Sequence, residues 1–250
     1  MSTTAKKGSH SLEDFAPFLR FLVGEAVPFS VIGGCAVGAY GRLRGVEVLS
    51  ADLDVYTSAM DLYVVVDKVR RAGVPILKEP KARNLPVAVF EWEGKEVNVL
   101  SSSKGLPDPE LVQRLAREFQ FRSLPGLSVL VADPFDLLAN KLAVNRPKDR
   151  PHIAVLRAFV EEEIVEAFER EEQPRKRIGP ARRYLEITDV KALPEPLAGR
   201  LVPLARIATD YYFLANHVPT KALAQTVRTT APDAARDQVN EILSRRRLRR

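Results

Sequence analysis

The stretch FSVIGGCAVGAYGRLRGVEVLSADLDVY, residues 29–56, contains the most informative pattern in this sequence. It opens with a short apolar run, residues 29–32, which reads as a buried strand. The glycine pair Gly33-Gly34 then turns the chain, and a helix can begin at Cys35. Glycine lets backbone amides approach a ligand closely, and the N-terminus of a helix favours an anion. The stretch therefore predicts a strand–turn–helix unit that can hold a phosphate.

Two aspartates follow on the next expected strand, residues 52–57. Side chains at positions i and i+2 of a strand point to the same face, so Asp52 and Asp54 should lie side by side. Two such carboxylates repel each other unless a cation lies between them, and hard oxygen ligands of this kind suit Mg²⁺ bound together with substrate phosphates. The alternative is a tight glycine turn followed by two solvated acids. The order of the two signals favours a site for a nucleoside triphosphate and magnesium.

Strand and helix signals alternate on both sides of this stretch. Residues 11–25 predict an amphipathic helix with Ser11 as its N-cap, and Ser58 caps a second helix. The segment EGK between residues 86–92 and 96–100 predicts a β-hairpin. Further elements are expected as helices over 108–119, 133–144 and 151–170, and as strands over 76–78 and 127–131.

The composition changes at EEQPRKRIGPARR, residues 171–183, which is charged and contains two prolines and a glycine. We expect a linker or exposed loop there. After it the chain looks helical, with helices over 195–216, 220–229 and 232–248. The sequence therefore predicts an α/β fold with a mixed sheet over residues 1–170, followed by a mainly helical C-terminal region over residues 184–250.

Charge and cysteine content narrow the class of protein. The chain has 250 residues, a net charge of +6 and a single cysteine, Cys35, which fits a reducing cytoplasm. No uncharged stretch is long enough to span a bilayer, so we expect no membrane contact.

Five arginines stand in the final six residues, RRRLRR. A basic tail of this kind can bind RNA or DNA phosphates, although a solvated helix end has the same composition.

The segments IGGCAVGAYG and SADLDVY resemble the opening motif of the nucleotidyltransferase superfamily with the DNA polymerase β-like fold. In that motif Gly-Gly or Gly-Ser precedes D-x-D, and the branches that look most similar include AbiEii-type toxins and small prokaryotic nucleotidyltransferases. The resemblance implies an NTP substrate, with Mg²⁺ on Asp52 and Asp54. It implies that Gly33, Gly34 and Ser50 lie beside the nucleotide. It also implies a possible toxin–antitoxin context, with an antitoxin protein as partner.

A second segment, residues 124–156, extends the resemblance. The family carries a strand and then a helix whose lysine lies near a K-D or R-D pair that opens the next helix. The matching positions are Lys141, Arg146, Lys148 and Asp149, which the resemblance places beside the triphosphate. Read from the residues alone, Lys141 is as well explained as a solvated helix lysine, and Asp149 as the cap of the helix that begins at Pro151. For His152, with no histidine or cysteine cluster nearby, we expect a structural role.

The sequence departs from the family at EVNVL, where Asn98 stands in place of a third carboxylate. That acid is thought to act as the base toward the acceptor hydroxyl. Asparagine cannot accept a proton at neutral pH, although its carbonyl can coordinate a metal. If Gly94-Lys95 formed a two-residue loop, Glu91 would lie opposite Asn98 and supply the missing carboxylate. The alternative is an exposed glutamate.

Three functions of different classes follow from these patterns. The first is an enzyme that transfers a nucleoside monophosphate from an NTP to a hydroxyl of RNA, such as a tRNA end, or of a protein. The second is a protein of the same fold that lost its third acid and binds nucleotide or RNA without turnover. The third is an interaction module whose C-terminal helices form the partner surface.

Overall fold

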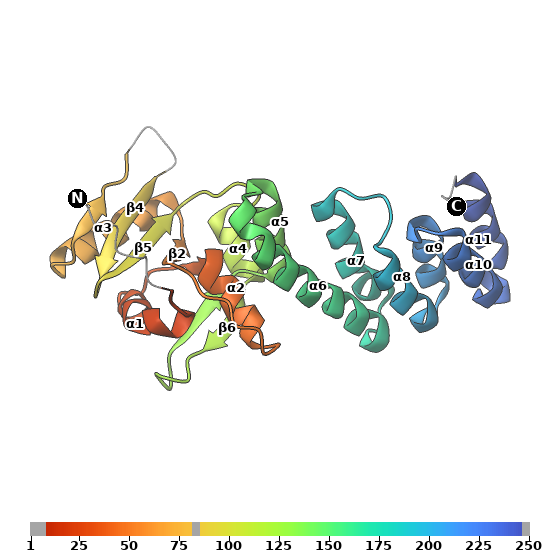
Figure 1. The fold of residues 1–250 in the computed structure, drawn as a ribbon, viewed down its shortest axis with the longest axis horizontal. Coiled ribbons are helices and arrows are strands. Elements are labelled where there is room, and N and C mark those ends of the chain that lie inside the picture. The colour runs from red at the N-terminus through yellow and green to blue at the C-terminus, as the bar shows by residue number, and fades with distance from the viewer. Residues whose placement is uncertain (1–8, 82–85, 247–250) are drawn as a thin grey trace. The chain divides into compact units, whose positions relative to one another are not determined.

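A computed structural model describes residues 9–81 and 86–246 of the chain (Figure 1). The chain divides into two compact units, Met1–Leu156 and Arg157–Arg250, and the division falls inside α6 (Arg150–Arg170). The first unit contains a sheet with helices packed on it, and the second is helical. This confirms the predicted fold class, a mixed sheet followed by a mainly helical region. No helix in the described parts of the chain is long and apolar enough to cross a membrane.

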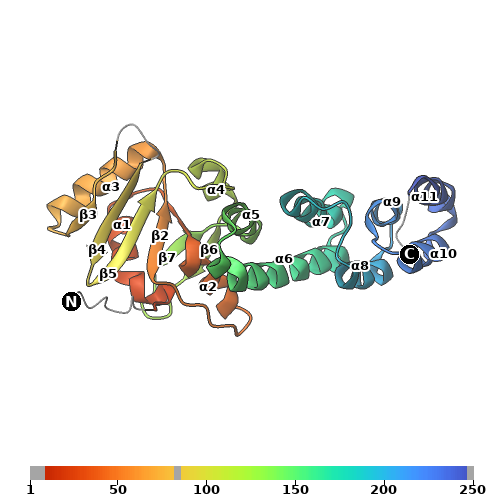
Figure 2. The same ribbon diagram turned by 45° about the horizontal axis from the view of Figure 1, so that its top comes forward.

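The first unit is built on a seven-stranded mixed sheet with the order β3-β4-β5-β2-β1-β7-β6. Figure 2 shows β4, β5 and β2 side by side within it. The strands are β1 (Ser30–Ile32), β2 (Asp52–Tyr56), β3 (Ile76–Lys78), β4 (Val87–Trp92), β5 (Lys95–Leu100), β6 (Arg117–Gln120) and β7 (Ser128–Val131). All but β6 match strands that the sequence predicts.

The topology brings several chain segments to one edge of this sheet. Strand β1 pairs antiparallel with β2 and parallel with β7, while β2 pairs parallel with β5. The end of β1, the end of β7 and the starts of β2 and β5 therefore lie together. Because Gly33 follows β1 and Asp52 opens β2, the two halves of the opening motif meet at this edge.

Helices cover the sheet and begin where the sequence places caps. Their bounds are α1 (Ala16–Gly24), preceded by a 3-10 turn (Leu12–Phe15), α2 (Gly33–Arg42), α3 (Ala59–Arg71), α4 (Pro109–Leu115) and α5 (Pro134–Val144). The backbone N–H of Ser11 donates to Asp14, and Ser58 accepts from the N–H of Asp61. Phe18, Leu19 and Leu22 of α1 are buried and Arg20 is exposed, which confirms the amphipathic helix.

The predicted helix over 108–119 is wrong in its second half. Helix α4 ends at Leu115, Ala116 is extended, and residues 117–120 form β6, which pairs antiparallel with β7. The segment REFQ has no apolar run because β6 lies at the edge of the sheet and buries little of its surface. Its hydrogen bonds to β7 decide its conformation, and local propensity does not.

The second unit corrects two further expectations. Its helices after α6 are α7 (Pro174–Thr188), α8 (Glu195–Leu201), α9 (Ala208–His217), α10 (Lys221–Thr230) and α11 (Asp233–Arg245). Residues 171–183 are therefore largely helical and do not form a linker, because Arg177 within them is fully buried. The predicted helix over 195–216 is interrupted between Leu201 and Ala208. The side chain of Asp210 accepts hydrogen bonds from the backbone N–H groups of Arg206 and Ile207. These bonds cap the N-terminus of α9, which is therefore a separate helix.

Candidate active site

Both residues of the glycine pair must lack a side chain, because neighbouring side chains occupy the space where a Cβ atom would lie. Gly33 has φ +71°, and a Cβ atom there would overlap the carboxylate of Asp54. A Cβ atom on Gly34 would overlap the hydroxyl of Ser50. Any other residue would therefore displace one of these two side chains. The Gly-Gly pattern thus lets the start of α2 lie directly against the start of β2.

The two aspartates lie on the same face of β2, as their spacing predicts, and Asn98 lies between them. In the register of β2 with β5, Asp54 is opposite Asn98. The Asn98 amide Nδ2 donates to Asp52 Oδ2 and to Asp54 Oδ1, at 3.1 Å each. Ser50 Oγ donates to Asp52 Oδ1 at 3.1 Å. An amide N–H₂ group thus occupies the position between two carboxylates that a cation would otherwise fill.

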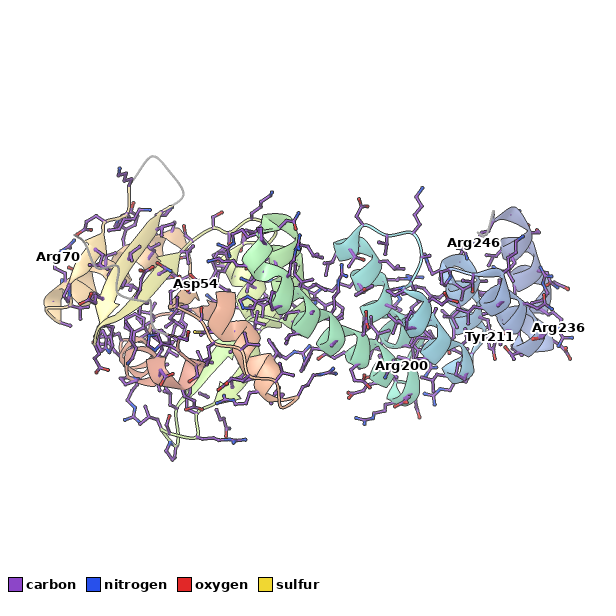
Figure 3. The ribbon with its side chains drawn as sticks, viewed as in Figure 1. Asp54, Arg70, Arg200, Tyr211, Arg236 and Arg246 are labelled. Carbon is purple, nitrogen blue, oxygen red and sulfur yellow. The ribbon has the colours of Figure 1, made fainter. Side chains whose placement is uncertain are left out.

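This arrangement changes the acidity of Asp54, which Figure 3 labels in the first unit. Burial raises the pKa of the Asp54 carboxyl to about 6, and the nearby charge of Asp52 acts in the same direction. The hydrogen bond from Asn98 opposes the rise. Asp54 is therefore only partly ionised near pH 6 unless a cation joins the site.

A cluster of cations stands at the same edge, held by one buried acid. Asp149 is 1% exposed, and its carboxylate accepts from Arg146 Nε at 2.7 Å and from Arg146 Nη2 at 3.1 Å. Lys141 Nζ, on α5, lies 3.5 Å from Asp149 Oδ1. Lys141 is itself buried and is not a solvated helix lysine. Asp149 therefore fixes both cations in place, and the charge of Arg146 holds the pKa of Asp149 low against its burial.

These groups line one cavity of about 430 Å³. Its lining residues are Gly34, Leu49, Ser50, Ala51, Asp52, Asp54, Asn98, Lys141, Arg146, Lys148, Asp149 and His152. Gly33, which the sequence singles out for the site, is not among the lining residues but packs against Asp54, which is. The cavity therefore brings the acid pair Asp52 and Asp54 together with the cations Lys141, Arg146 and Lys148.

Glu91 is the residue singled out from the sequence that does not reach this cavity. The hairpin loop is Glu93-Gly94, both at positive φ, and not Gly94-Lys95. Glu91 therefore pairs with Glu96, while Val89 faces Asn98. Glu91 is also exposed. The predicted register is wrong, because two adjacent turns were available to this segment and the pairing of β4 with β5 selects the other one.

His152 lines the cavity, although the sequence offers only a structural role for it. Its Nδ1 is enclosed with no hydrogen-bond partner among the described residues, and lies 3.8 Å from Asp149 Oδ1. Burial and the charge of Lys141 lower the pKa of the imidazole, although Asp149 opposes them. Its position three residues after Asp149 was the available signal, since i and i+3 meet on a helix face.

The acid pair and its neighbours fit a hard divalent cation. No group of three or more His, Cys, Asp or Glu side chains that could hold a metal is present in the described residues. Two carboxylates with one amide suit Mg²⁺, which takes few protein ligands and completes its shell with water and phosphate oxygens. A half-turn of the Asn98 amide would present its carbonyl oxygen to the ion in place of its N–H₂ group.

Solved structures match this fold, whereas no family model and no curated protein matches the sequence. The first is a lincomycin-bound lincosamide antibiotic adenylyltransferase, with 12% identity and a TM-score of 0.46, over 61% of this chain and 99% of that one. The second is the antibiotic-resistance factor ANT(2'')-Ia, with 14% identity and a TM-score of 0.42, over 71% and 95%. The third, from Thermotoga maritima, is assigned as a nucleotidyltransferase, with 17% identity and a TM-score of 0.40, over 63% and 99%.

The chain is similar to nucleotidyltransferases. This similarity is one of fold, so what the cavity does in this chain has to follow from its own residues. Those residues are two acids, an amide, three cations, one buried aspartate and one histidine.

The stability of the protein should respond to pH and Mg²⁺ through Asp54. Its pKa rises from 3.8 to about 6 in the folded state, so the metal-free protein should lose stability as the pH rises through this window. The loss should reach about 1–3 kcal/mol above pH 6 and be absent below pH 4. Thermal unfolding with and without Mg²⁺ at pH 5 and pH 8 tests this. We expect stabilisation by Mg²⁺ mainly at pH 8, and equal stabilisation at both values would contradict it.

Proposed function

We propose that this chain is a cytoplasmic, Mg²⁺-dependent nucleotidyltransferase that transfers a nucleoside monophosphate from an NTP to a hydroxyl acceptor. The observation that carries the proposal is the cavity that the Asp52–Asp54 pair shares with Lys141 and Arg146. A triphosphate needs positive charge along its oxygens and a metal beside the reacting phosphorus, and the cavity has groups for both.

Each group has a distinct part in this proposal. Asp52 and Asp54 hold Mg²⁺, which neutralises charge on the triphosphate. Lys141 and Arg146 bind phosphate oxygens, and Asp149 keeps both cations oriented in the absence of ligand. Lys148 adds a third cation at the cavity wall. Gly33 and Gly34 let the start of α2 lie against Asp54 and Ser50, and the backbone N–H groups there bind the phosphates in this proposal.

The test is transfer of label from each of the four NTPs, with Mg²⁺, to total RNA or to protein. We expect labelled product from the wild type and a loss of at least about 1,000-fold in Asp52→Ala, because electrostatic stabilisation of this kind is worth several kcal/mol. Asp67→Ala, which removes a half-exposed acid on α3 paired with Arg71, is the matched control. Label transfer that persists in Asp52→Ala would refute the proposal.

A second candidate function is binding of a nucleotide without turnover. The observation that favours it is Asn98, whose amide bridges the two aspartates in place of a third carboxylate. In this case the wild type would bind Mg²⁺–NTP, measured by calorimetry, and transfer no label. Asn98→Asp is then the informative variant, because a restored third acid should create label transfer that the wild type lacks.

RNA is the acceptor that we favour, because the second unit has a cationic pocket. The pocket has a volume of about 270 Å³ and is lined by Lys221, Ala224, Gln225, Arg228, Leu243 and Arg246, with no carboxylate among these described residues. Arg246, labelled in Figure 3, donates to the carbonyls of Ala215 and Val218, which fixes it at the end of α9. The basic tail at residues 247–250 lies outside the described residues.

Removing two of these cations should weaken RNA binding and its dependence on salt. In Lys221→Ala/Arg228→Ala we expect the slope of log K against log [salt] for single-stranded RNA to fall by about 1.4, since each phosphate contact contributes about 0.7. Arg236→Ala is the control, because Arg236 already pairs with Asp233. Fluorescence anisotropy over a salt series measures both, and an unchanged slope would favour a protein acceptor.

The toxin-type role and an antitoxin partner rest on the motif resemblance, and growth arrest by wild type but not by Asp52→Ala would test them.

A further inference from the structure

The proposed transfer releases a proton that some group must take. The acceptor oxygen forms a bond to the α-phosphorus, the bond from that phosphorus to the β-phosphate oxygen breaks, and pyrophosphate leaves. The acceptor O–H proton must then pass to a base in the cavity. Asn98 cannot accept it, because an amide is not basic at neutral pH. Asp52 and Asp54 are committed to the cation in this proposal, and Glu91 does not line the cavity.

His152 is the remaining neutral base at the cavity wall. It lies at the start of α6, three residues after Asp149, and its ring packs near Gly34. Nδ1 is enclosed and faces Asp149 Oδ1 at 3.8 Å. We assign the proton of the neutral ring to Nδ1, beside this carboxylate, which leaves the lone pair on Nε2. An acid that orients a histidine tautomer in this way is a recurring arrangement for general bases, and it often tightens when the ligand binds.

The charges around His152 set its protonation state. Lys141 on α5, together with Arg146 and Lys148 in the segment before α6, disfavours the imidazolium, and Asp149 favours it. Burial adds to the effect of the cations, so the pKa of His152 lies below its ordinary value and the ring is neutral at pH 7. Asp52 and Asp54 belong to the same cavity. A neutral imidazole is the form that can accept a proton.

We infer that His152 is the general base of this chain, taking the acceptor hydroxyl proton on Nε2 while Asp149 positions the ring and holds Lys141 and Arg146. The inference rests on the proposed nucleotidyl transfer. It assigns to a histidine on α6 the proton-accepting role that residue 98 on β5 cannot perform. Asp149 is a positioning residue in this scheme, since it acts through the three groups that it contacts.

The test compares His152→Gln with His217→Gln. His217 is a suitable control, because it is also a partly buried histidine with a lowered pKa, but it belongs to the second unit and lies near the Lys191 carbonyl. In His152→Gln we expect label transfer at pH 7 to fall about 100- to 10,000-fold, with the Kd for Mg²⁺–NTP unchanged within about twofold. The ascending limb of the pH–rate profile should disappear, and added imidazole should restore part of the rate. His217→Gln should behave as the wild type.

A second measurement does not depend on activity, and it needs only one of two folded variants, His152→Gln or His152→Asn. The chain has three histidines, so the His152 ring signal in NMR can be identified by comparison with His152→Gln or His152→Asn. We expect its titration midpoint below 6.5, and a change in its shift when Mg²⁺ and a non-hydrolysable NTP analogue bind. A midpoint above 7 would overturn the inference.

The outcomes separate this inference from the proposed function. Wild-type transfer that Asp52→Ala abolishes and His152→Gln leaves unchanged, with the same pH profile, would remove His152 as the base and keep the enzyme. A wild type that binds NTP but transfers no label to any acceptor would remove both and favour the binding function. A fall in NTP affinity equal to the fall in rate would instead assign His152 to substrate binding.

Discussion

Replacing Arg177 with methionine should lower the free energy of unfolding of the second unit by about 3–5 kcal/mol. Arg177 and Asp210 are both fully buried, and the guanidinium Nη2 lies 2.7 Å from Asp210 Oδ2. Arg177 also donates to the carbonyls of Glu171 and Leu204, and it lies over the ring of Phe168 at 5.5 Å. Methionine fills much of the volume but leaves Asp210 as a buried charge without its partner.

Urea unfolding followed by circular dichroism measures this effect. The matched control is Arg236→Met, which removes a half-exposed arginine paired with Asp233 on α11 and should cost less than about 1 kcal/mol. Because asparagine removes the buried charge but keeps an oxygen that can accept from the backbone N–H groups of Arg206 and Ile207, Arg177→Met/Asp210→Asn should be more stable than the single variant. A single-variant loss similar to that of Arg236→Met would contradict the structure of this unit.

Replacing Gly33 with alanine should lower the proposed nucleotidyl transfer by about 100-fold with little loss of secondary structure. The new Cβ would overlap the Asp54 carboxylate, and the backbone at φ +71° is one that alanine adopts only with strain. Asp54 must then move away from Asp52 and Asn98, which removes one half of the proposed metal site. Calorimetry with Mg²⁺–NTP should show the weaker binding directly.

Gly24→Ala is the control for this variant. Gly24 ends α1, and a Cβ atom there has no neighbour within 4 Å. We expect unchanged transfer and unchanged or slightly higher stability, because alanine reduces the freedom of the unfolded chain. If Gly33→Ala bound Mg²⁺–NTP as tightly as Gly24→Ala, the acid pair could not be the metal site.

Much of the fold could be predicted from local patterns in the sequence. Strands β1, β2 and β5 and helices α1, α3 and α5 follow from apolar periodicity and from caps such as Ser58 and Asp133. The strand over residues 117–120 could not be predicted in this way, because an edge strand that buries little surface has no apolar pattern of its own. The prediction of a loop over residues 171–183 was wrong for a related reason. A charged segment with prolines looks exposed, and only the tertiary structure shows that its arginine is buried against Asp210.

The candidate site could likewise be predicted only in part from the sequence. The sequence alone determined which residue types were available: a glycine pair, two aspartates at i and i+2, and cations near Asp149. These signals are local, since strand alternation and turn geometry depend on neighbours in the chain. Only the tertiary structure decided that α5 and the start of α6 meet β2 in one cavity, because this depends on the parallel pairing of β1 with β7.

Two residues, Glu91 and His152, have roles in the structure that differ from those predicted from the sequence. Glu91 depended on a hairpin register, and the pairing of β4 with β5 moved its partner from Asn98 to Glu96. His152 lies beside Asp149 through the local spacing of three residues, and tertiary packing placed both at the cavity. The sequence by itself determined the acid pair and the glycines that accommodate it. The tertiary structure decided which acids, cations and base share that space, because only packing brings distant segments of the chain together.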